Sequence, residues 1–390
     1  MLDGTISVHS LSPKQISIAE LVSLCRSGSQ DGHTYICRTT TAGSANISPF
    51  ASAPENPEPC KAVTQYMSRA FAHSWSDEYI IFCNFPCYVV TANGSVITRD
   101  HKIIGESVFP SAGEETPSHF LGVHLPSHDI GELVARAGRV TTDKICAAFF
   151  SRWSRVYFHA ISECLVQDHI FTRTGVRPYL LHLSAENINQ VQRKFVDLLQ
   201  PDIQFLPHDI VDVPRTLFST VTRRHGVLGL DFRLAIESIR LNAAEQAAAL
   251  KHIEAAPRLY ISRIGEGMRP LANEAEVMEI FAAEGFRVVR PQNLSLTEQA
   301  RLFSNASVVV GPHGAGLVNA AFAKPRAVVF EMRGLNRKGG SPDMNDSYRK
   351  VSAVMGLRYG FHIVENDVDS DTWSIPAATA AQIARCLRDA

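Results

Sequence analysis

The sequence predicts an α/β protein built from two Rossmann-like domains that face a central cleft. The first observation behind this prediction is an alternation of helical and strand patterns from about residue 150 onward, which is typical of parallel βαβ units. The second observation is another series of such units after Pro257. The third is length, because 390 residues exceed the usual size of a single hydrophobic core.

The composition sets limits on the class of partner. With 45% hydrophobic and 20% charged residues, the chain can bury a full core and is not a disordered polymer. Lys and Arg total 38 and Asp and Glu total 39, so the net charge of -1 gives no overall attraction to nucleic acid or to an anionic membrane. We therefore expect no nucleic-acid partner, and any bound anion must meet a local cluster of positive charge.

Cysteine usage and hydropathy indicate a cytoplasmic protein. The eight cysteines include no CxxC pair and no zinc-type spacing with histidine, which favours buried free thiols over disulfides. The N-terminus lacks a basic start followed by an apolar core, and no stretch approaches the ~20 apolar residues of a membrane span. The longest candidate, "YIIFCNFPCYVV", is interrupted by Asn84 and Pro86. We expect no integral membrane segment.

Breaks in the pattern predict three parts of the chain. Residues 1–75 form an N-terminal extension and linker, within which the Pro- and Ser-rich residues 42–60 predict a surface loop. Residues 76–250 form an α/β domain with a β-hairpin around Asn93-Gly94, and residues 251–390 form a C-terminal Rossmann-like domain.

Individual elements follow from periodicity and from breaker residues. In the first α/β domain we expect helices over 156–173, 186–200 and 233–255, and strands over 178–183 and near 203–206. In the C-terminal domain we expect strands over 258–264, 286–291, 307–311 and 327–332, and helices over 273–285, 295–306 and 317–323.

The stretch "VVVGPHGAGLVN" (residues 308–319) predicts an anion site. A buried strand that ends in a Gly-rich turn and leads into a helix directs free backbone N–H groups and the positive helix end at one spot. Gly311, Gly314 and Gly316 permit close approach of a ligand, and His313 could donate a hydrogen bond to the same anion or to a sugar hydroxyl. The alternative is a glycine-shaped turn with a structural histidine. The spacing matches neither G-x-G-x-x-G nor the P-loop.

Charged residues follow two other predicted strands. Arg263 lies at the end of "RLYISR", and Arg269 and Asn273 follow it, so we expect these side chains at the carboxyl edge of the sheet, where α/β proteins bind ligands. Two arginines there can neutralise a diphosphate without a metal. Glu331, at the end of "AVVFE", is placed to accept hydrogen bonds from ribose hydroxyls. Surface ion pairs for the arginines and a solvated strand end for Glu331 are the alternatives.

The segments "RLYISR", "RPLANEAEV", "GFRVVRPQNLSLTEQARLFSNASVVVGPHGAGLVNAAF" and "VVFEM" occur between residues 258 and 332. In order and spacing they resemble glycosyltransferase family 61. "SRVYFHAISE" (154–163) is similar to the family's Tyr-Phe-His segment with an acid four residues after the histidine. The family often has glycine after the proline of its Asn-x-x-Phe element, whereas here Arg326 follows Pro325.

The resemblance implies a GT-B fold, with an acceptor-side N-terminal domain and a C-terminal domain that binds a nucleotide-sugar donor, usually a UDP-sugar. It further implies inversion at the anomeric carbon, a glycan or other hydroxyl acceptor, and a role in polysaccharide or glycoconjugate synthesis. No cofactor or metal is expected. The expected donor-binding residues are Arg263, Arg269, Asn273, His313, Gly314, Ala315, Gly316, Asn319 and Glu331.

His159 and Glu163 are the candidate catalytic residues. They are four residues apart, so on a helix they share one face. A carboxylate in a closed, partly dry cleft can gain the basicity needed to accept a hydroxyl proton, which makes Glu163 the first candidate for the general base. His159 would orient it or contact the donor. Histidine as the base and a simple hydrogen-bonded pair on a solvated helix face are the alternatives.

Two other functions stay open. A metal-dependent transferase could use Asp367, Asp369 and Asp371 of "DVDSD" to hold Mn²⁺ or Mg²⁺, although an ordinary acidic loop explains the same residues. A non-catalytic nucleotide-sugar or glycan-binding protein could keep the fold without the chemistry. Donor hydrolysis by purified protein separates binding from catalysis.

Overall fold

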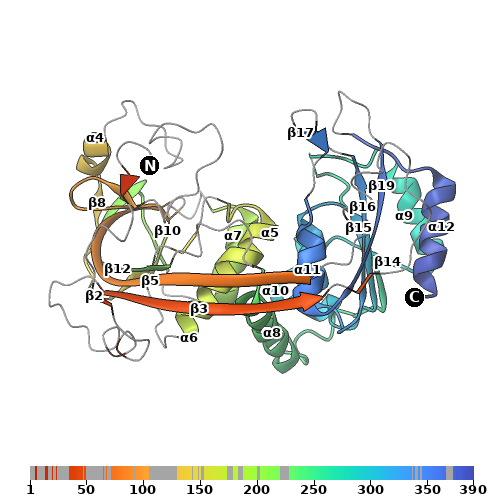
Figure 1. The fold of residues 1–390 in the computed structure, drawn as a ribbon, viewed down its shortest axis with the longest axis horizontal. Coiled ribbons are helices and arrows are strands. Elements are labelled where there is room, and N and C mark those ends of the chain that lie inside the picture. The colour runs from red at the N-terminus through yellow and green to blue at the C-terminus, as the bar shows by residue number, and fades with distance from the viewer. Residues whose placement is uncertain are drawn as a thin grey trace. The chain divides into compact units, whose positions relative to one another are not determined.

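The computed structural model covers the chain as two compact units, which are described separately (Figure 1). Unit 1 is Met1–Ala42 with Ser76–Ala235, and unit 2 is Gly43–Trp75 with Ile236–Ala390. The described residues are all except 1–4, 7–13, 16–19, 21–22, 24–34, 47, 50–64, 66, 68–71, 92–93, 105–129, 143, 148, 151–152, 174–178, 183–187, 200–202, 220–227, 267, 336, 339–340, 343–344 and 366–371.

Unit 2 contains a parallel sheet whose strand order reverses once. The sheet order is β14-β13-β15-β16-β19-β4, and every neighbouring pair is parallel. Apart from the edge strand β4, chain order runs outward from β13 in both directions, so the sheet has a topological switch point between β13 and β15. The strands are β13 (Arg258–Ile261), β14 (Arg287–Val289), β15 (Val308–Pro312), β16 (Val328–Gly334), β19 (Arg358–Val364) and β4 (Ser48–Pro49).

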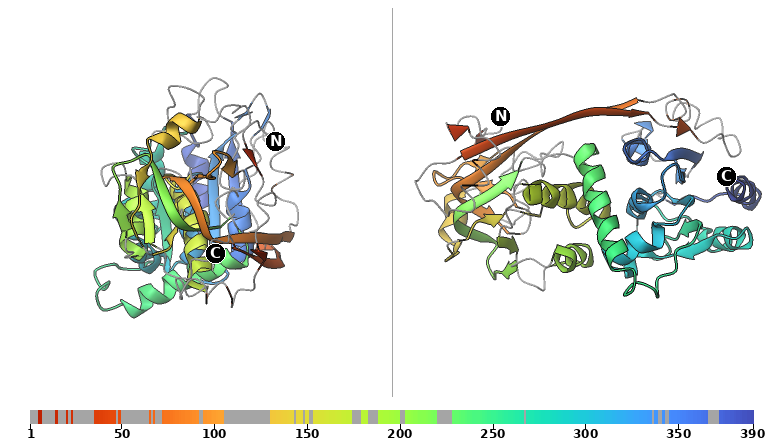
Figure 2. Two further views of the ribbon diagram at one scale, coloured as in Figure 1. Left: turned by 90° about the vertical axis from the view of Figure 1, so that its left-hand side faces the viewer. Right: turned by 90° about the horizontal axis from the view of Figure 1, so that it is seen from below.

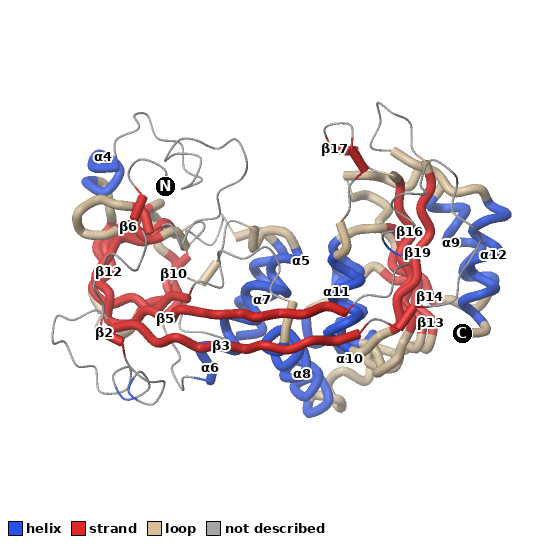
Figure 3. Tube along the Cα trace, viewed as in Figure 1, coloured by secondary structure: helices blue, strands red, loops and turns tan. Residues whose placement is uncertain are grey.

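Helices cover both faces of this sheet (Figures 1 and 3). α9 and α12 pack together on one face, and α10, η8 and α11 pack on the other. The helices are α9 (Glu274–Ala283), α10 (Leu296–Phe303), α11 (Ser347–Met355) and α12 (Ala377–Arg388), with 3-10 helices η7 (Pro291–Asn293) and η8 (Ala315–Phe322). A two-stranded antiparallel pair, β17 (Arg337–Lys338) and β18 (Ser341–Pro342), completes unit 2.

β15, β16 and β19 lie side by side (blue strands in Figure 2, left), and both faces of these strands are apolar over most of their length, as in a sheet covered by helices on both sides. Val308, Val310, Phe330 and Met332 belong to the core that Phe281 of α9 shares with α12. Residues at the alternating positions of β16 face the other way, since successive side chains of a strand point to opposite faces. That alternation places the Glu331 carboxylate and the Arg333 guanidinium on the side of α11.

The described residues of unit 1 form a mixed sheet with eleven strands. β9, β10 and β11 are parallel neighbours joined through helices, and β12 pairs parallel with β9 and antiparallel with β5. The strands are β1 (Thr5–Ile6), β2 (Lys14–Gln15), β3 (Tyr35–Asn46), β5 (Ala72–Val90), β6 (Val96–Ile97), β7 (Ile103–Ile104), β8 (Gly138–Arg139), β9 (Cys146–Ala147), β10 (Tyr179–His182), β11 (Ile203–Phe205) and β12 (Ile210–Ser219).

The helices of unit 1 are α4 (Ile130–Ala135), α5 (Tyr157–His159), the π-helix η4 (Ala160–Cys164), α6 (Leu165–Arg173) and α7 (Gln190–Leu199). α8 (Leu230–Glu245) begins in unit 1 and ends in unit 2. None of the helices in the described part of the chain is long and apolar enough to cross a bilayer.

The structure confirms the α/β class and most expected elements. The hairpin is present as antiparallel β5 and β6, with Gly94 at a φ of 70° in the turn. The expected loop over 42–60 is wrong at its start, because β3 extends to Asn46 and β4 adds to the edge of the unit 2 sheet. A Pro-rich composition does not prevent this, since an edge strand has N–H groups that need no partner. The expected helix over 233–255 ends early at Glu245, and turns follow it. The two-domain arrangement around a cleft stays a prediction.

Arg326 occupies a strained backbone position. Its φ of 66° lies in the left-handed region, which favours glycine, and this residue stands where the resembling family often has glycine. Its N–H donates to the carbonyl of Gly356 at 3.0 Å, which fixes the turn before β16 against the end of α11. The turn geometry is therefore kept without the glycine.

The capping box of α10 provides the first test. Ser295 accepts from the Glu298 N–H at 3.2 Å, and Glu298 accepts from the Ser295 N–H at 2.8 Å. Ser295→Ala should lower the free energy of unfolding by about 1 kcal/mol, because the Glu298 N–H in the first turn of α10 loses its acceptor. Urea unfolding measures the loss, and Ser295→Asp, which keeps a capping oxygen, should restore most of it. An unchanged midpoint in the alanine variant would contradict this account.

Candidate functional site

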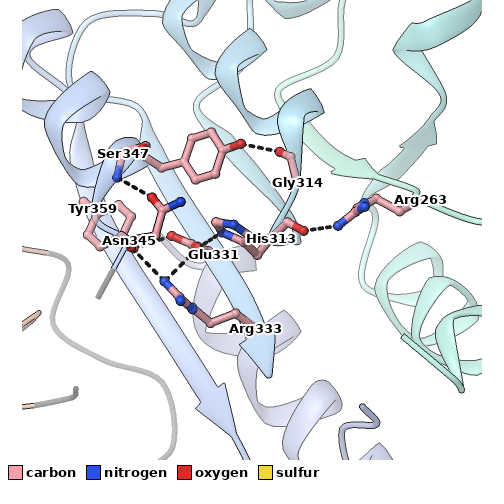
Figure 4. Close-up of polar contacts among 9 residues, drawn as sticks. Arg263, His313, Gly314, Glu331, Arg333, Asn345, Ser347 and Tyr359 are labelled. Carbon is pink, nitrogen blue, oxygen red and sulfur yellow. Dashed lines mark hydrogen bonds and ion pairs between the residues drawn. The ribbon is translucent and has the colours of Figure 1, made fainter. Parts of the chain in front are cut away.

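The candidate site of unit 2 lies at the carboxyl ends of β13, β15 and β16 (Figure 4). Arg263 follows β13, His313 follows β15, and Glu331 and Arg333 lie in the last half of β16. At a switch point the two flanking crossovers run to opposite faces of the sheet, which leaves a crevice outside the strand ends. The structure therefore brings together residues from three strands at the position where doubly wound sheets bind ligands.

A buried histidine–glutamate pair forms the centre of the site. Nδ1 of His313 makes a short hydrogen bond to Oε1 of Glu331, and the two side chains are 7% and 1% exposed. The Tyr359 hydroxyl donates to the second Glu331 oxygen at 2.5 Å, and Arg333 Nη1 lies 3.8 Å from the first. Both carboxylate oxygens of Glu331 are therefore engaged by protein groups, and its position makes it a support for His313.

Burial and neighbouring charges fix the protonation of this pair. Burial lowers the pKa of His313, and the nearby Arg333 and Arg269 act in the same direction against the attraction of Glu331. Burial alone would raise the pKa of Glu331, but the contacts from His313, Arg333 and Tyr359 outweigh it and hold that pKa below its usual value. At neutral pH His313 is uncharged and donates through Nδ1, which leaves a lone pair on Nε2.

Arg263 is held against the Gly-rich turn. Its guanidinium donates to the His313 carbonyl and, at 2.9 Å, to the Met268 carbonyl. Its backbone N–H donates to the buried carboxylate of Glu274 at 2.6 Å. Burial, with the like charge of Arg269, lowers the pKa of Arg263. Such a desolvated, fixed guanidinium is a strong partner for an anion.

Arg269 combines a strained backbone with a buried nitrogen that has no partner among the described residues. It has a φ of 51°, a backbone conformation that side-chain-bearing residues rarely adopt, and its Nε is buried with no hydrogen-bond partner among the described residues. The Trp373 indole N–H donates to its carbonyl at 3.3 Å and helps to hold the turn. Strained backbone and a buried unpaired donor are typical of ligand sites.

The turn between β15 and η8 presents small residues and backbone donors. Ala315 and Gly316 begin η8, so their N–H groups have no partner within the helix. The Gly314 carbonyl accepts from the Leu317 N–H at 3.0 Å and from the Tyr348 hydroxyl at 2.5 Å. The expected helix here is a 3-10 helix, which begins directly after the glycine.

Two predicted donor-binding residues lie beside this arrangement and not at its centre. Asn273, which precedes α9, connects the start of this helix to the residues before α12. Its amide donates to the Ile375 carbonyl at 2.8 Å and accepts from the Ile375 N–H at 3.2 Å. Asn319 is fully buried in η8. The structure thus gives both residues a place in the framework of the site.

The second candidate pair lies in unit 1. His159 Nδ1 and Glu163 Oε1 are 2.8 Å apart, as the i,i+4 spacing predicts. Glu163 lies within the π-helical turn η4, an element that often occurs at functional sites. The Glu163 side chain is 1% exposed and that of His159 is 14% exposed, so this is not a pair on a solvated helix face.

Sequence reasoning missed four side chains of the unit 2 site: Glu274, Arg333, Tyr348 and Tyr359. Arg333 had a usable signal, because it lies two residues after Glu331 and a strand places both on one face. The tyrosines come from α11 and β19, which the sequence analysis did not specify.

No metal-type cluster of three or more His, Cys, Asp or Glu side chains occurs among the described residues. Asp367, Asp369 and Asp371 lie outside the described residues. Four described cysteines are free thiols, of which Cys87, Cys146 and Cys164 are buried as predicted.

Comparisons with known proteins confirm the resemblance. Residues 157–330 match the family described as Glycosyltransferase 61. Over 126 residues the chain is 31% identical to protein O-linked-mannose β-1,4-N-acetylglucosaminyltransferase 2 of Xenopus laevis and 29% identical to the protein of the same name from Xenopus tropicalis. Each alignment covers 31% of this chain and 21% of the relative, so the chain spans about a fifth of the length of the curated relatives it matches.

Gly314 provides the test of this geometry. Its backbone is extended, so the angles do not require glycine, but a Cβ would lie 2.5 Å from Cζ and Nε of Arg263. Gly314→Ala should displace that guanidinium and weaken binding of inorganic pyrophosphate by roughly tenfold or more, the value of a lost charged hydrogen bond. The control is Glu279→Ala, an exposed position on α9 at the opposite face of the sheet. Calorimetric titration measures both, and equal affinities for the two variants would refute the packing argument.

Proposed function

From the match of residues 157–330 to glycosyltransferase family 61, we propose that the protein is an inverting, metal-independent glycosyltransferase. The donor is a nucleotide-sugar, most readily a UDP-sugar, and the acceptor is a hydroxyl group of a glycan or other glycoconjugate. The proposed donor site is the switch point of unit 2. The cytoplasmic location and the role in polysaccharide synthesis stay predictions.

One observation carries the proposal: positive charge and backbone donors converge at one strand edge. Arg263, Arg269 and Arg333 supply three guanidinium groups against two buried carboxylates, Glu331 and Glu274. The first N–H groups of η8 lie at the same turn. A chain with a net charge of -1 has no general attraction for anions, so this local excess supports a specific diphosphate site.

The chemistry follows from this charge arrangement. Transfer breaks the bond between the anomeric carbon and the diphosphate oxygen, and the electron pair stays on that oxygen. Fixed guanidinium groups and helix N–H donors stabilise the charge that develops there, and they need no reorganisation during the step. Arginines in this role replace the divalent cation that many nucleotide-sugar enzymes require.

The acceptor hydroxyl must lose a proton as its oxygen bonds to the sugar. We assign this proton to the His159–Glu163 pair. The sequence favoured Glu163 as the base, but Glu163 is buried and bonded to Nδ1 of His159, which is the more exposed member. We therefore propose that Nε2 of His159 accepts the proton and that Glu163 holds the imidazole in the required tautomer, as a carboxylate does in hydrolase triads.

The donor site and the metal question can be tested together. Purified protein is first screened with UDP-, GDP- and CMP-sugars. With the donor that it uses, it should release the nucleotide at the same rate in EDTA as without EDTA. Arg263→Ala should lower both nucleotide affinity and turnover by on the order of 10-fold to 100-fold, since it removes charged hydrogen bonds. Arg258→Ala, at the amino end of the same strand, is the control and should keep both. Activity that is lost in EDTA and restored by Mn²⁺ would refute the metal-free account.

The catalytic pair has its own test. His159→Asn should lower turnover by a factor on the order of 10² or more with nearly unchanged nucleotide affinity, because a base acts only on the transfer step. Glu163→Gln should also lower turnover, since the tautomer is no longer fixed. The exposed Asp197→Asn serves as the control. If His159→Asn keeps most of its turnover while Glu163→Gln loses it, Glu163 is the base.

A further inference from the structure

His313 is built to change its role when a ligand binds. Its Nδ1 is committed to Glu331, whereas Nε2 makes no hydrogen bond with the described residues. Arg269 Nε is fully buried without a partner in the described part of the chain, whereas His313 Nε2 is not fully buried and keeps some exposed area. The backbone of His313 is held on both sides, by Met332, whose carbonyl accepts its N–H at 2.7 Å, and by Arg263. The imidazole therefore has a fixed orientation and one available nitrogen.

Charged and titratable groups face this imidazole from every element around it. β16 contributes Glu331 and Arg333, the turn after β13 contributes Arg263 and Arg269, α11 contributes Tyr348, and β19 contributes Tyr359. The Tyr348 ring lies edge-on to the imidazole at 5.5 Å between centroids. Without a ligand, these three guanidinium groups stand against the buried carboxylates of Glu331 and Glu274, and a protonated His313 would add to the excess of positive charge.

A bound diphosphate reverses this balance. Its negative charge meets the three guanidinium groups, so a further positive charge on His313 becomes favourable. Glu331 already lies at Nδ1 and stabilises the imidazolium once it forms. A neutral imidazole with its proton on Nδ1 can only accept a hydrogen bond at Nε2. The imidazolium has a proton on each nitrogen and therefore donates from Nε2.

We propose that binding of the donor's diphosphate is coupled to uptake of one proton at His313, which turns Nε2 into a charged hydrogen-bond donor to the leaving diphosphate. This inference rests on the proposed function, because it takes the diphosphate as the ligand of the unit 2 site. Glu331 and Tyr359 are positioning residues in this scheme. They hold the ring and its tautomer and do not touch the donor.

The proton on His313 gives the site an additional positive charge while the donor or the nucleotide product is bound. Solvent supplies it when the donor binds. As the bond to the anomeric carbon breaks, the diphosphate gains negative charge, and the imidazolium strengthens its hydrogen bond without transferring the proton. The acceptor's proton goes separately to the His159–Glu163 pair, and the proton on His313 returns to solvent when the nucleotide leaves.

Calorimetric titration of the full chain with UDP tests the proposal. The titration is done at about pH 8, above the ~6 at which a terminal phosphate titrates, in two buffers with different ionisation enthalpies. Burial lowers the pKa of free His313 and the ligand raises it, so the complex binds more protons than the free protein. We expect uptake approaching one proton per UDP, and an affinity that falls about tenfold per pH unit between the two pKa values. Inorganic pyrophosphate should give the same sign.

His313→Gln should still bind UDP but take up no proton, whereas the buried His362→Gln of β19 should keep the uptake. Glu331→Gln should reduce it, because the imidazolium loses its counter-charge. Equal heats in both buffers for the wild-type protein would overturn the proposal without any variant, and so would full uptake by His313→Gln. If neither UDP nor pyrophosphate binds the wild-type protein, the proposed function fails together with this inference. If both bind without proton uptake, only the inference fails.

Discussion

The reversal of strand order between β13 and β15 is the constraint on which the site in unit 2 depends. In a parallel sheet each crossover carries the chain back to the amino end of the next strand. The residues that follow each strand therefore all lie at the carboxyl ends of the strands. Where the order reverses, the crossovers leave on opposite faces and no helix covers the strand ends. Arg263 and His313 follow the two strands at this point, and a chain that ran in one direction would separate them.

Packing around this crevice leaves some polar groups satisfied and others not. Glu331 has partners on both oxygens, which an ionised carboxylate buried at 1% exposure requires. Arg269 has strained backbone and an unpaired buried nitrogen, although the turn that carries it is fixed by Trp373. A fold that satisfies the Glu331 carboxylate and leaves the buried Nε of Arg269 without a partner among the described residues is consistent with an anionic ligand at this site.

The chain uses the same pairing twice. In each unit a histidine Nδ1 contacts a glutamate Oε1, in one case within a helix and in the other between two parallel strands. In both arrangements the carboxylate sets the tautomer of the imidazole. Their surroundings differ: three arginines surround the pair in unit 2, which suits it to an anion, whereas Trp153 and Phe158 flank the imidazole in unit 1. The difference matches the proposed division between leaving group and acceptor proton.

The sequence by itself determined those features of the two candidate sites that depend only on residues close together in the chain. His159 and Glu163 are one helical turn apart, so their contact followed from the sequence, as did the position of His313 in a glycine turn after a strand. The motifs also predicted the match of residues 157–330 to glycosyltransferase family 61, because order and spacing along the chain are properties of the sequence.

Tertiary structure alone decided the partners that are distant in sequence. Alternation along β16 points Glu331 toward the α11 side, and register places it opposite residues of β15 and β19, where His313 and Tyr359 contact it. Its expected contact with a ribose stays a prediction. The requirement for glycine at position 314 comes from the Arg263 guanidinium and not from its own backbone angles. Strand register and helix packing bring residues together over 18 to 50 positions of the chain, and no local pattern records which ones meet.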